Sequence, residues 1–322
     1  MATSEATAER PATGLDRHAG VLVAGSETLI GGALARRLAR HGFTRLVTEA
    51  PDLTDRASVD RWFARHRPAY VFLAGGLSGG IGLNQVRPAD LILDNLLVEC
   101  HVIDAAHRYG VKKLVCLGSS CSYPREAPQP LREESLLSGA LEPTSAAYAV
   151  GKIAGIALCD AYRQQHGCWF QPVIPADAFG IGDDFSPERS HVVPALIRKM
   201  HDAKLAGSSS VDLWGTGTPR REFVFADDLA DACVWVMERA GTPSLINVGG
   251  GTNLSIRELA LAVRQVVGYD GTLQFDPSRP DGMPLKALDS SRLRALGWRP
   301  STPLRDALTL TYDWFLAHTG RI

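Results

Sequence analysis

Tyr148 and Lys152 have the types and the spacing needed for proton transfer to a carbonyl oxygen. The segment Tyr148-Ala-Val-Gly-Lys152 places a phenol and an ammonium four residues apart, and these positions share one face of a helix. A nearby cation favours the phenolate and lowers the pKa of a tyrosine toward neutrality. Such a tyrosine can protonate a carbonyl oxygen while a hydride reduces the carbon. The pair therefore predicts a reductase in which Lys152 also contacts the nicotinamide ribose.

Two serines follow an apolar run that precedes this pair. The run Leu114–Leu117 is expected to be a buried strand, and it continues into Leu117–Pro124 (LGSSCSYP). Ser119 or Ser120 would then lie at the carboxyl edge of a sheet, where α/β proteins bind their ligands. A hydroxyl at that edge can bind the substrate carbonyl.

A glycine-containing loop near the start of the chain has the position of a dinucleotide site. The loop Gly25–Gly31 (GSETLIG) lies between an apolar run and a helix-period segment, and glycines let the backbone approach a pyrophosphate at a helix N-terminus. Thr28 stands where a middle glycine is usual, so a plain strand-to-helix turn is the alternative. The expected cofactor contacts are Gly25, Glu27, Thr28, Leu29, Ile30, Glu49 and Lys152.

Acidic residues around this loop bear on which cofactor binds. A 2′-phosphate normally meets Arg or Lys here, but this chain has Glu27 in the loop and Glu49 after the second expected strand. Glu49 lies 24 residues after Gly25, near the spacing of an acid that binds a ribose diol. These residues favour NAD(H) over NADP(H); the alternative for Glu49 is an exposed loop position.

Strand-like and helix-like segments alternate through the first half of the chain. Strands are expected at Val21–Ala24, Arg45–Val47, Tyr70–Leu73 and Leu114–Leu117, and helices at Ile30–His41, Arg56–Arg65, Ala89–Tyr109 and Tyr148–His166. This alternation predicts an α/β fold, a Rossmann-type doubly wound parallel sheet with helices on both faces. Residues 18–177 would form mainly this dinucleotide-binding domain.

From about Ala178 the alternation loosens, which indicates a smaller C-terminal α/β substrate lobe over residues 178–322, with segments crossing back to the sheet. A loop is expected at Gly180–Ser190, turns at Trp214–Pro219 and Ser278–Pro284, and helices at Val193–Lys204, Asp227–Glu238 and Ser255–Val267. This lobe would cap the ligand edge of the sheet. Residues Met1 to Arg17 have no apolar periodicity, so a disordered tail is expected there.

Composition narrows the class of protein. The 322 residues include 34 Lys+Arg and 35 Asp+Glu, a net charge of −1, and 45% are hydrophobic. That apolar fraction supports a buried core, and the balanced charge gives no reason to expect nucleic acid as a partner. No apolar run reaches the roughly 18 residues of a membrane span. Six cysteines form no CxxC pair, so we expect free thiols in a reducing cytoplasm and no metal site.

Five short stretches occur in a specific order. They are Leu117–Pro124 (LGSSCSYP), Leu141–Thr144 (LEPT) before Tyr148 and Lys152, Ser190–Leu196 (SHVVPAL), Trp214–Phe223 (WGTGTPRREF) and Pro280–Gly282 (PDG) before Lys286. From about Val21 to the C-terminus, the chain resembles the extended short-chain dehydrogenase/reductase superfamily and, within it, the GDP-L-fucose synthase family. Several such stretches in one order are more specific than any single motif.

This resemblance implies C3/C5 epimerisation and C4 reduction of GDP-4-keto-6-deoxy-D-mannose, or of a close 4-keto sugar. By resemblance, Ser119, Tyr148 and Lys152 would form the reduction triad, and Cys121 and His191 the acid/base pair. The chemistry is consistent, because a C4 ketone acidifies the hydrogens on both neighbouring carbons. One group can then remove a proton while another returns one to the opposite face.

The same resemblance implies a nucleotide-sugar site and a homodimer. Arg221 and Lys286 match positions that hold the nucleotide diphosphate, Trp214 lies on the same wall, and Lys199 stands where the family usually has Arg. The expected substrate contacts are Ser120, Asp177, Lys199, Trp214, Arg221 and Lys286. The resemblance favours NADP(H), against the acidic residues near the loop. The dimer would pair the helices Ala89–Tyr109 and Tyr148–His166 of two subunits.

The chain departs from that family mainly on the cofactor side. Thr28 and Glu27 replace a glycine and, in bacterial members, an arginine, and Leu77 stands where bacterial relatives often have Lys. Asp177 replaces the asparagine of Asn-x-Tyr-Gly-Pro and brings a negative charge near the reacting sugar. We therefore expect the epimerisation chemistry to be retained while the cofactor, or the exact sugar, differs.

Other roles compete with these assignments. Cys121 could be a small buried hydrophobe, His191 a polar cap of the following helix, Arg221 part of a solvated charge cluster, and Trp214 a core residue. For the whole protein the alternatives are an NAD-retaining nucleotide-sugar epimerase or dehydratase, and a non-catalytic dinucleotide-binding regulatory protein.

Overall fold

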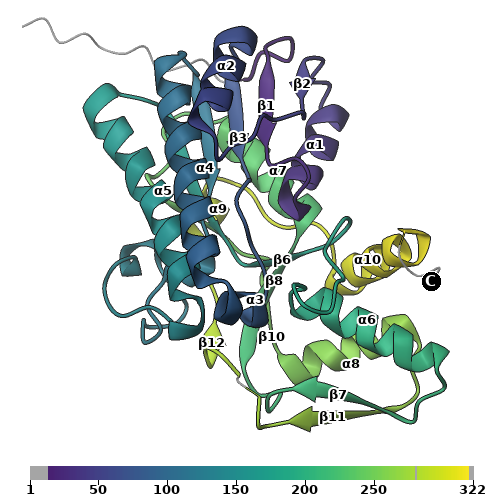
Figure 1. Ribbon diagram of the computed structural model, residues 1–322. Coiled ribbons are helices and arrows are strands. Elements are labelled where there is room, and N and C mark those ends of the chain that lie inside the picture. Colours follow the sequence, from purple (N-terminus) through teal and green to yellow (C-terminus); the bar gives the residue numbers. More distant parts are fainter. Residues whose placement is uncertain (1–13, 280, 319–322) are drawn as a thin grey trace, which may run out of the picture.

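A parallel sheet forms the centre of the computed structural model, which describes residues 14–279 and 281–318. Its strand order is β2-β1-β3-β4-β5-β9, and every pairing is parallel (Figure 1). The strands are β1 (Val21–Ala24), β2 (Leu46–Val47), β3 (Tyr70–Leu73), β4 (Lys113–Leu117), β5 (Phe170–Pro175) and β9 (Ile246–Val248). The expected Rossmann-type α/β fold is confirmed.

Helices cover both faces of this sheet because successive side chains of a strand point to opposite faces. Val21 and Val23 pack with α1 and α7, whereas Leu22 and Ala24 pack with α2 and α4. The helices are α1 (Leu29–Arg40), α2 (Arg56–His66), α4 (Pro88–Arg108), α5 (Ala146–His166) and α7 (Ala226–Met237). The helices expected from periodicity are confirmed to within one or two residues at their ends.

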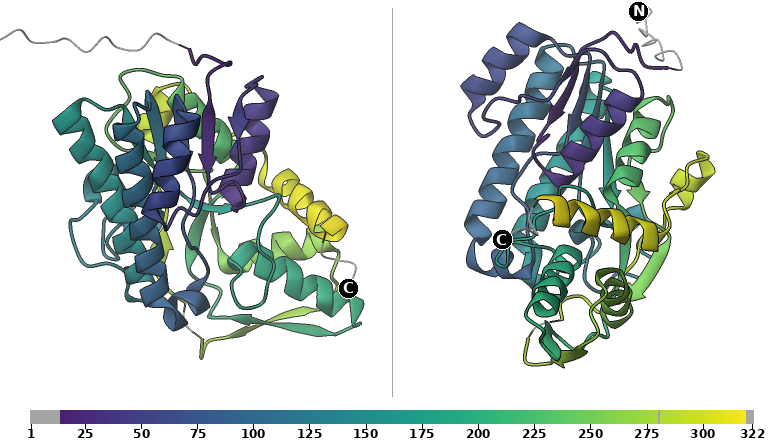
Figure 2. Two further views of the ribbon diagram at one scale, coloured as in Figure 1. Left: turned by 45° about the horizontal axis from the view of Figure 1, so that its top comes forward. Right: turned by 90° about the vertical axis from the view of Figure 1, so that its right-hand side faces the viewer.

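A second lobe stands below the sheet in Figure 2, and α10 lies at the junction of the two parts. One of its sheets contains β6 (Asp177–Phe179), β8 (Arg220–Phe225), β10 (Thr252–Ser255) and β12 (Leu285–Lys286); the other pairs β7 (Ser210–Trp214) with β11 (Thr272–Asp276). A separate apolar core joins β6, β7, β8 and β11 to α6 (Val192–Leu205), α8 (Ile256–Val267) and α10 (Leu304–His318). Shorter elements are α3 (Ile81–Val86), α9 (Ser291–Ala295) and the 3₁₀ turns η1 (Ser120–Ser122), η2 (Glu133–Ser135) and η3 (Pro143–Ser145).

The segment after β12 joins the second lobe to the central sheet. The N–H of Leu131 donates to the carbonyl of Ala287 at 2.7 Å. The Nδ2 of Asn247, in β9, donates to the carbonyls of Leu131 and Asp289 at 2.9 and 3.1 Å. Both parts of the molecule are therefore tied together by buried hydrogen bonds from residues far apart in the chain.

Some sequence expectations are wrong or lie outside the described residues. Residues 1–13 of the expected disordered tail lie outside the described residues. The last part of that prediction is wrong, because Leu15 packs against the core and the N–H of Asp16 donates to the Tyr70 hydroxyl at 3.2 Å. Trp214, expected in a turn, is the last residue of β7. Pro280, in the second expected turn, is outside the described residues. Among the helices described, none is long and apolar enough to cross a membrane.

Candidate active site

The loop after β1 is shaped by two glycines that no other residue could replace. Gly25 has a φ of 89°, and a Cβ there would lie 2.4 Å from the Cα of Gly75, in the loop after β3. A Cβ on Gly31 would lie 1.9 Å from the carbonyl oxygen of Gly25. The backbone is therefore packed closely around the N-terminus of α1, which fits the cradle for a dinucleotide pyrophosphate.

Thr28 does not need to be a glycine, because its φ is −79° and it is the N-cap of α1. Its Oγ1 accepts a hydrogen bond from the N–H of Gly31 at 3.0 Å and donates to the carbonyl of Gly25 at 2.8 Å. The first N–H groups of a helix have no acceptor within it, so those of Leu29 and Ile30 are placed to face a phosphate. A capping threonine thus occupies the place of the middle glycine without disturbing the start of α1.

A cavity of about 650 Å³ opens beside this loop. Four acidic residues line it, and no Lys or Arg stands among the described residues that do so. Ser26 donates a hydrogen bond to the carbonyl of Thr48 at 2.6 Å, which ties the loop to the segment after β2. The lining residues that carry the argument are Glu27, Glu49, Asp52 and Asp94.

The expected reduction residues come from β4 and α5. Ser119 follows β4 as the N-cap of η1, and its Oγ accepts a hydrogen bond from the N–H of Cys121 at 3.2 Å. Because that oxygen accepts, its own proton remains free to donate to a carbonyl oxygen. Tyr148 and Lys152 lie one turn apart on α5, and the phenol interacts electrostatically with the ammonium.

Lys152 is buried and held by polar partners. Its Nζ lies 3.0 Å from Oε1 of Glu99, on α4, and 3.5 Å from the carbonyl oxygen of Gly75. Burial is the largest single effect on the pKa of the lysine and would lower it, but Glu99, Tyr148 and Cys116 together raise the pKa above its ordinary value. Lys152 therefore carries a positive charge at the loop that contacts Gly25.

The register of the second lobe brings a further charged group to η1. Asp177 pairs with Phe223 in β8 and Lys286 with Arg221, because β6 and β12 both run parallel to β8. The Nζ of Lys286 lies 2.6 Å from Oδ1 of Asp177 and 3.9 Å from Sγ of Cys121. Cys121 is half-buried in an ionic setting, so its interpretation as a packing hydrophobe is wrong.

The electrostatics of this group favour its ionised form. Burial would raise the pKa of Asp177, but Lys286 and Arg221 outweigh it and the pKa lies below its usual value. Burial would lower the pKa of Lys286, but Asp177 and the Cys121 sulfur outweigh it and the pKa is raised. Ser120 adds a hydrogen bond to Asp177 at 3.4 Å. An aspartate in place of the family's asparagine thus binds the lysine beside the expected acid/base cysteine.

His191 stands at the N-terminus of α6. It occupies the N-cap position, but its side chain makes no capping hydrogen bond, so the capping role is wrong for its imidazole. The ring Nε2 lies 3.5 Å from the hydroxyl of Ser78. Desolvation by neighbouring protein groups lowers its pKa, and the nearby Asp177 carboxylate opposes this. The side chain remains open to solvent, as a residue that meets a substrate requires.

The remaining expected substrate residues form a wall around Trp214. The indole is 50% exposed, so the alternative of a core residue is wrong. The Lys199 ammonium and the Arg279 guanidinium lie 5.9 and 5.0 Å from the ring. Asp281 connects this wall to Arg221, because its carboxylate accepts from the N–H of Thr216 at 2.8 Å and its carbonyl accepts from the guanidinium at 3.4 Å.

Several residues of these sites were missed from the sequence. Glu99 carried a signal, since it is a charged residue four positions after Asn95 on the apolar face of an expected helix. Asp281 lies in the Pro280–Gly282 stretch that contributes to the resemblance, but no role was assigned to it. Ser78 and Arg279 carried no signal, because each acts through a contact with a distant segment.

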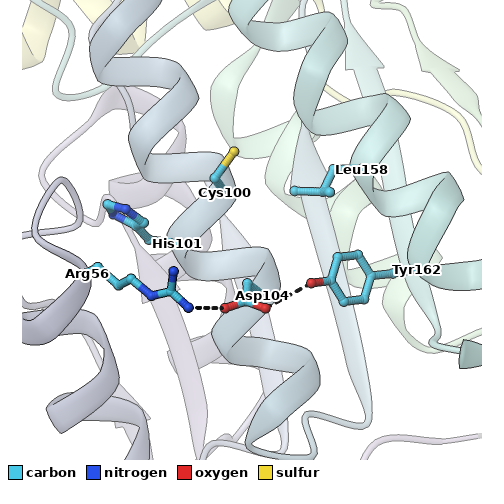
Figure 3. A pocket seen from close by; sticks show the side chains of 6 residues that line it. All are labelled: Arg56, Cys100, His101, Asp104, Leu158 and Tyr162. Carbon is cyan, nitrogen blue, oxygen red and sulfur yellow. Dashed lines mark hydrogen bonds and ion pairs between the residues drawn. The ribbon is translucent and has the colours of Figure 1, made fainter.

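A second cavity, of about 360 Å³, lies between α2, α4 and α5 (Figure 3). None of the expected site residues lines it. Its polar groups bind one another: Asp104 accepts from the Tyr162 hydroxyl at 2.9 Å and pairs with Arg56 at 3.5 Å. Cys100 and His101 also line it, and a ring nitrogen of His101 lies 3.1 Å from the carbonyl oxygen of Leu53.

Three comparisons place the chain among known proteins. The profile of the NAD-dependent epimerase/dehydratase family matches residues 21–249. GDP-L-fucose synthase 1 of Arabidopsis thaliana is 49% identical over 94% of each chain. Among solved structures, a GDP-6-OMe-4-keto-L-xylo-heptose reductase from Campylobacter jejuni superposes with a TM-score of 0.90 at 33% identity, covering 95% of this chain and 100% of that one. A GDP-L-fucose synthetase from Naegleria fowleri with NADP bound gives 0.88 at 26% identity, covering 98% of each.

Proposed function

The chain belongs to the NAD-dependent epimerase/dehydratase family, and we propose that it converts GDP-4-keto-6-deoxy-D-mannose, or a close 4-keto sugar, to GDP-L-fucose. It would epimerise C3 and C5 and reduce C4 by hydride transfer. One observation carries this: Ser119 is the N-cap of the turn η1, which packs against α5, the helix of Tyr148 and Lys152, and Cys121 within η1 lies 3.9 Å from the ammonium of Lys286. The groups proposed for the two chemistries of the reaction thus lie two positions apart in the chain.

The division of labour follows from this geometry. Residues 18–177 would bind mainly the dinucleotide, and residues 178–322 mainly the nucleotide sugar. A reduced nicotinamide dinucleotide, bound at Gly25–Gly31, supplies the hydride. Tyr148 would protonate the C4 oxygen, while Ser119 donates a hydrogen bond to it and stabilises the negative charge that forms when C3 or C5 loses a proton.

The acid/base and binding roles fall to the second lobe and η1. Cys121 and His191 would remove and return protons on opposite faces of the sugar. Arg221 and the wall around Trp214 would bind the GDP moiety, with guanidinium groups suited to phosphate oxygens. The remaining proposed substrate contacts are Ser120, Asp177, Lys199 and Lys286.

The test is an assay of the purified protein with GDP-4-keto-6-deoxymannose in deuterated solvent. Loss of nicotinamide absorbance together with deuterium at C3 and C5 is the expected result. Deuterium uptake without oxidation of either reduced cofactor would restrict the activity to epimerisation. Absence of both signals would refute this substrate.

We also infer that the enzyme uses NADH in preference to NADPH. The cavity beside the loop presents Glu27 and Glu49, whose carboxylates would repel a 2′-phosphate but can accept hydrogen bonds from a ribose diol. The N. fowleri structure with bound NADP shows that this fold also accommodates the phosphorylated cofactor. The preference therefore rests on side chains and not on the fold.

The double substitution Glu27→Arg/Glu49→Arg is expected to raise kcat/KM for NADPH relative to NADH by about tenfold or more, because each change removes a repulsion and adds a phosphate partner. Thr28 is left in place because it caps α1. Steady-state kinetics with both cofactors measure the ratio. A matched control, Glu126→Arg/Asp313→Arg, makes the same charge change at two exposed positions outside the cavity. An unchanged ratio in the first variant would contradict the inference.

One observation favours a second function, an NAD-retaining epimerase or dehydratase. The acidic cavity suits a ribose diol that never leaves the enzyme, although the Cys121/His191 pair has no evident use in such a reaction. NAD that stays bound through purification, with no net oxidation of added NADH, would support this alternative.

A homodimer through α4 and α5 completes the proposal. Leu93 and Val150 are 58% and 43% exposed on these two helices, and apolar side chains on neighbouring helices are typical of a covered surface. Sedimentation equilibrium should give twice the chain mass. Leu93→Glu is expected to shift the protein toward monomer, and a wild-type monomer at micromolar concentration would refute the dimer.

A further inference from the structure

Glu99 is a buried acid to which no role in the reaction has yet been given. Its side chain is 1% exposed and lies 3.0 Å from the ammonium of Lys152, which is 7% exposed. Burying two charges is costly, and replacing such a pair by apolar residues is often neutral or stabilising. Stability alone therefore does not explain an acid at this position.

The two helices are built to admit this carboxylate. A Cβ on Gly155 would lie 1.5 Å from Oε2 of Glu99, and a Cβ on Gly151 would lie 2.9 Å from Cβ of Asn95. Two glycines four residues apart on α5 thus face two polar side chains four residues apart on α4. Glycine is a poorer helix former than alanine, so the close contact is a specific feature of this helix pair.

The pair lies directly behind the nucleotide loop. Lys152 Nζ is 3.5 Å from the carbonyl oxygen of Gly75, and Gly75 is the residue that leaves no room for a Cβ on Gly25. We propose that Glu99 is a positioning residue, which holds the ammonium of Lys152 charged and in place at the nicotinamide site. This inference rests on the proposed role of Lys152 in binding the nicotinamide ribose.

Electrostatics supports the same assignment. The ionisable groups that act on Lys152 to raise its pKa are Glu99 from α4, Tyr148 from α5 and Cys116 from β4, and they outweigh the effect of burial. Of these, only a carboxyl group ionises below neutral pH in its unperturbed state. Burial raises the pKa of Glu99, and the ammonium of Lys152 opposes that effect, so each member of the pair favours the charged form of the other. Without the charge of Glu99, burial would dominate and the pKa of Lys152 would fall. The ammonium would then lose its proton, and its hydrogen bonds to the ribose, within the working pH range.

The test is the pH dependence of dinucleotide binding in Glu99→Gln, with NADH or NADPH as the probe, whichever binds the wild type more tightly. The amide keeps the shape of the side chain and removes its charge. Between about pH 6.5 and about pH 9.5, the wild-type Kd should stay constant, while the Kd of the variant should rise by about tenfold or more as Lys152 deprotonates. A flat profile in Glu99→Gln would overturn the proposal.

Asp104→Asn is the matched control. Asp104 also lies on α4 and accepts a hydrogen bond from a residue of α5, Tyr162, but does not contact Lys152. Its profile should follow the wild type. If both variants show the same pH dependence, a general weakening of the helix pair explains the effect and the specific role is refuted.

Gly155→Ala provides a second variant if Glu99→Gln does not fold. Its Cβ would displace the flexible carboxylate without removing it, so we expect a smaller rise of Kd with pH than in Glu99→Gln. A Kd that does not rise with pH would overturn the proposal. The binding assay contains no sugar. Absence of turnover with GDP-4-keto-6-deoxymannose would therefore count only against the proposed function. Binding by the variants that does not depend on pH would count only against the role of Glu99.

Discussion

Tyr148→Phe is expected to lower the rate of hydride transfer to the C4 ketone by about 10²–10⁴-fold, the usual contribution of a general acid. The substitution removes only the hydroxyl that would protonate the C4 oxygen. Ser119 still donates a hydrogen bond to that oxygen, and Lys152 keeps its ion pair with Glu99. Dinucleotide affinity should therefore remain close to that of the wild type, and the loss should fall on kcat. Single-turnover decay of the nicotinamide absorbance at saturating substrate measures it.

Tyr162→Phe is the control for this variant. Tyr162 lies on the same helix, and its hydroxyl also binds a neighbouring side chain, the carboxylate of Asp104 at 2.9 Å. It lines the second cavity, whose lining includes none of the expected site residues (Figure 3). Wild-type rates are expected for it. Should Tyr148→Phe retain full activity, the proton would have to come from another group and the proposed reduction triad would be wrong.

The second large effect is expected on epimerisation. Cys121→Ser and His191→Asn should each lower deuterium incorporation at C3 or C5 by about 10²–10⁴-fold, because each removes one of the two groups that move protons at carbon. Mass spectrometry of the recovered sugar, or its proton NMR spectrum, measures the exchange. Hydride transfer to a 4-keto sugar that needs no inversion should continue, since Ser119, Tyr148 and Lys152 are untouched.

The chain offers a matched pair for comparison. Cys168 and His107 are also a cysteine and a histidine, in contact at 3.2 Å, and neither lies at η1. Cys168→Ser and His107→Asn should leave exchange unchanged. Exchange that persists in both Cys121→Ser and His191→Asn would remove these residues from the mechanism.

The exchange reaction should also depend on pH in a stated direction. Desolvation lowers the pKa of His191 below 6.5, so the imidazole is neutral at pH 7 and able to accept a proton. The rate that depends on this base should be constant above that lowered pKa and fall as the pH decreases through it. An acid limb that persists unchanged in His191→Asn would assign the titration to another group.

The central sheet could be predicted from the sequence because its signals are local. The apolar runs of β1, β3 and β4 and the periodicity of α1 and α4 are each contained in a few consecutive residues. Parallel strands buried on both faces read as continuous apolar runs, and α/β topology then places the following loops at one edge. This reasoning predicts Gly25 and either Ser119 or Ser120 at that edge, and only the family resemblance selects Ser119 for the reduction triad.

The charged group at η1 could not be predicted in the same way. The sequence placed Asp177 near the sugar and Lys286 near the diphosphate, but nothing local indicated that they form an ion pair. Their contact depends on the register of β6 and β12 against β8, strands that are short and far apart in the chain. Thr28 could not be interpreted from the motif for a different reason. The motif expects a glycine at this position, whereas here the backbone is stabilised by a threonine hydroxyl that caps α1.

If Lys286 has the role proposed for it, the pairing of β12 with β8 also bears on the order in which the site is completed during synthesis. Chains emerge from the ribosome in sequence, and early segments fold before later ones arrive. The nucleotide loop and η1 are complete long before Lys286 is synthesised, so Asp177 must wait more than a hundred residues for its counter-ion. A nascent chain could thus hold its dinucleotide early, while the protein stays unable to process sugar until one of its last strands docks. Cofactor loading and catalytic competence would be separate events in the life of each molecule.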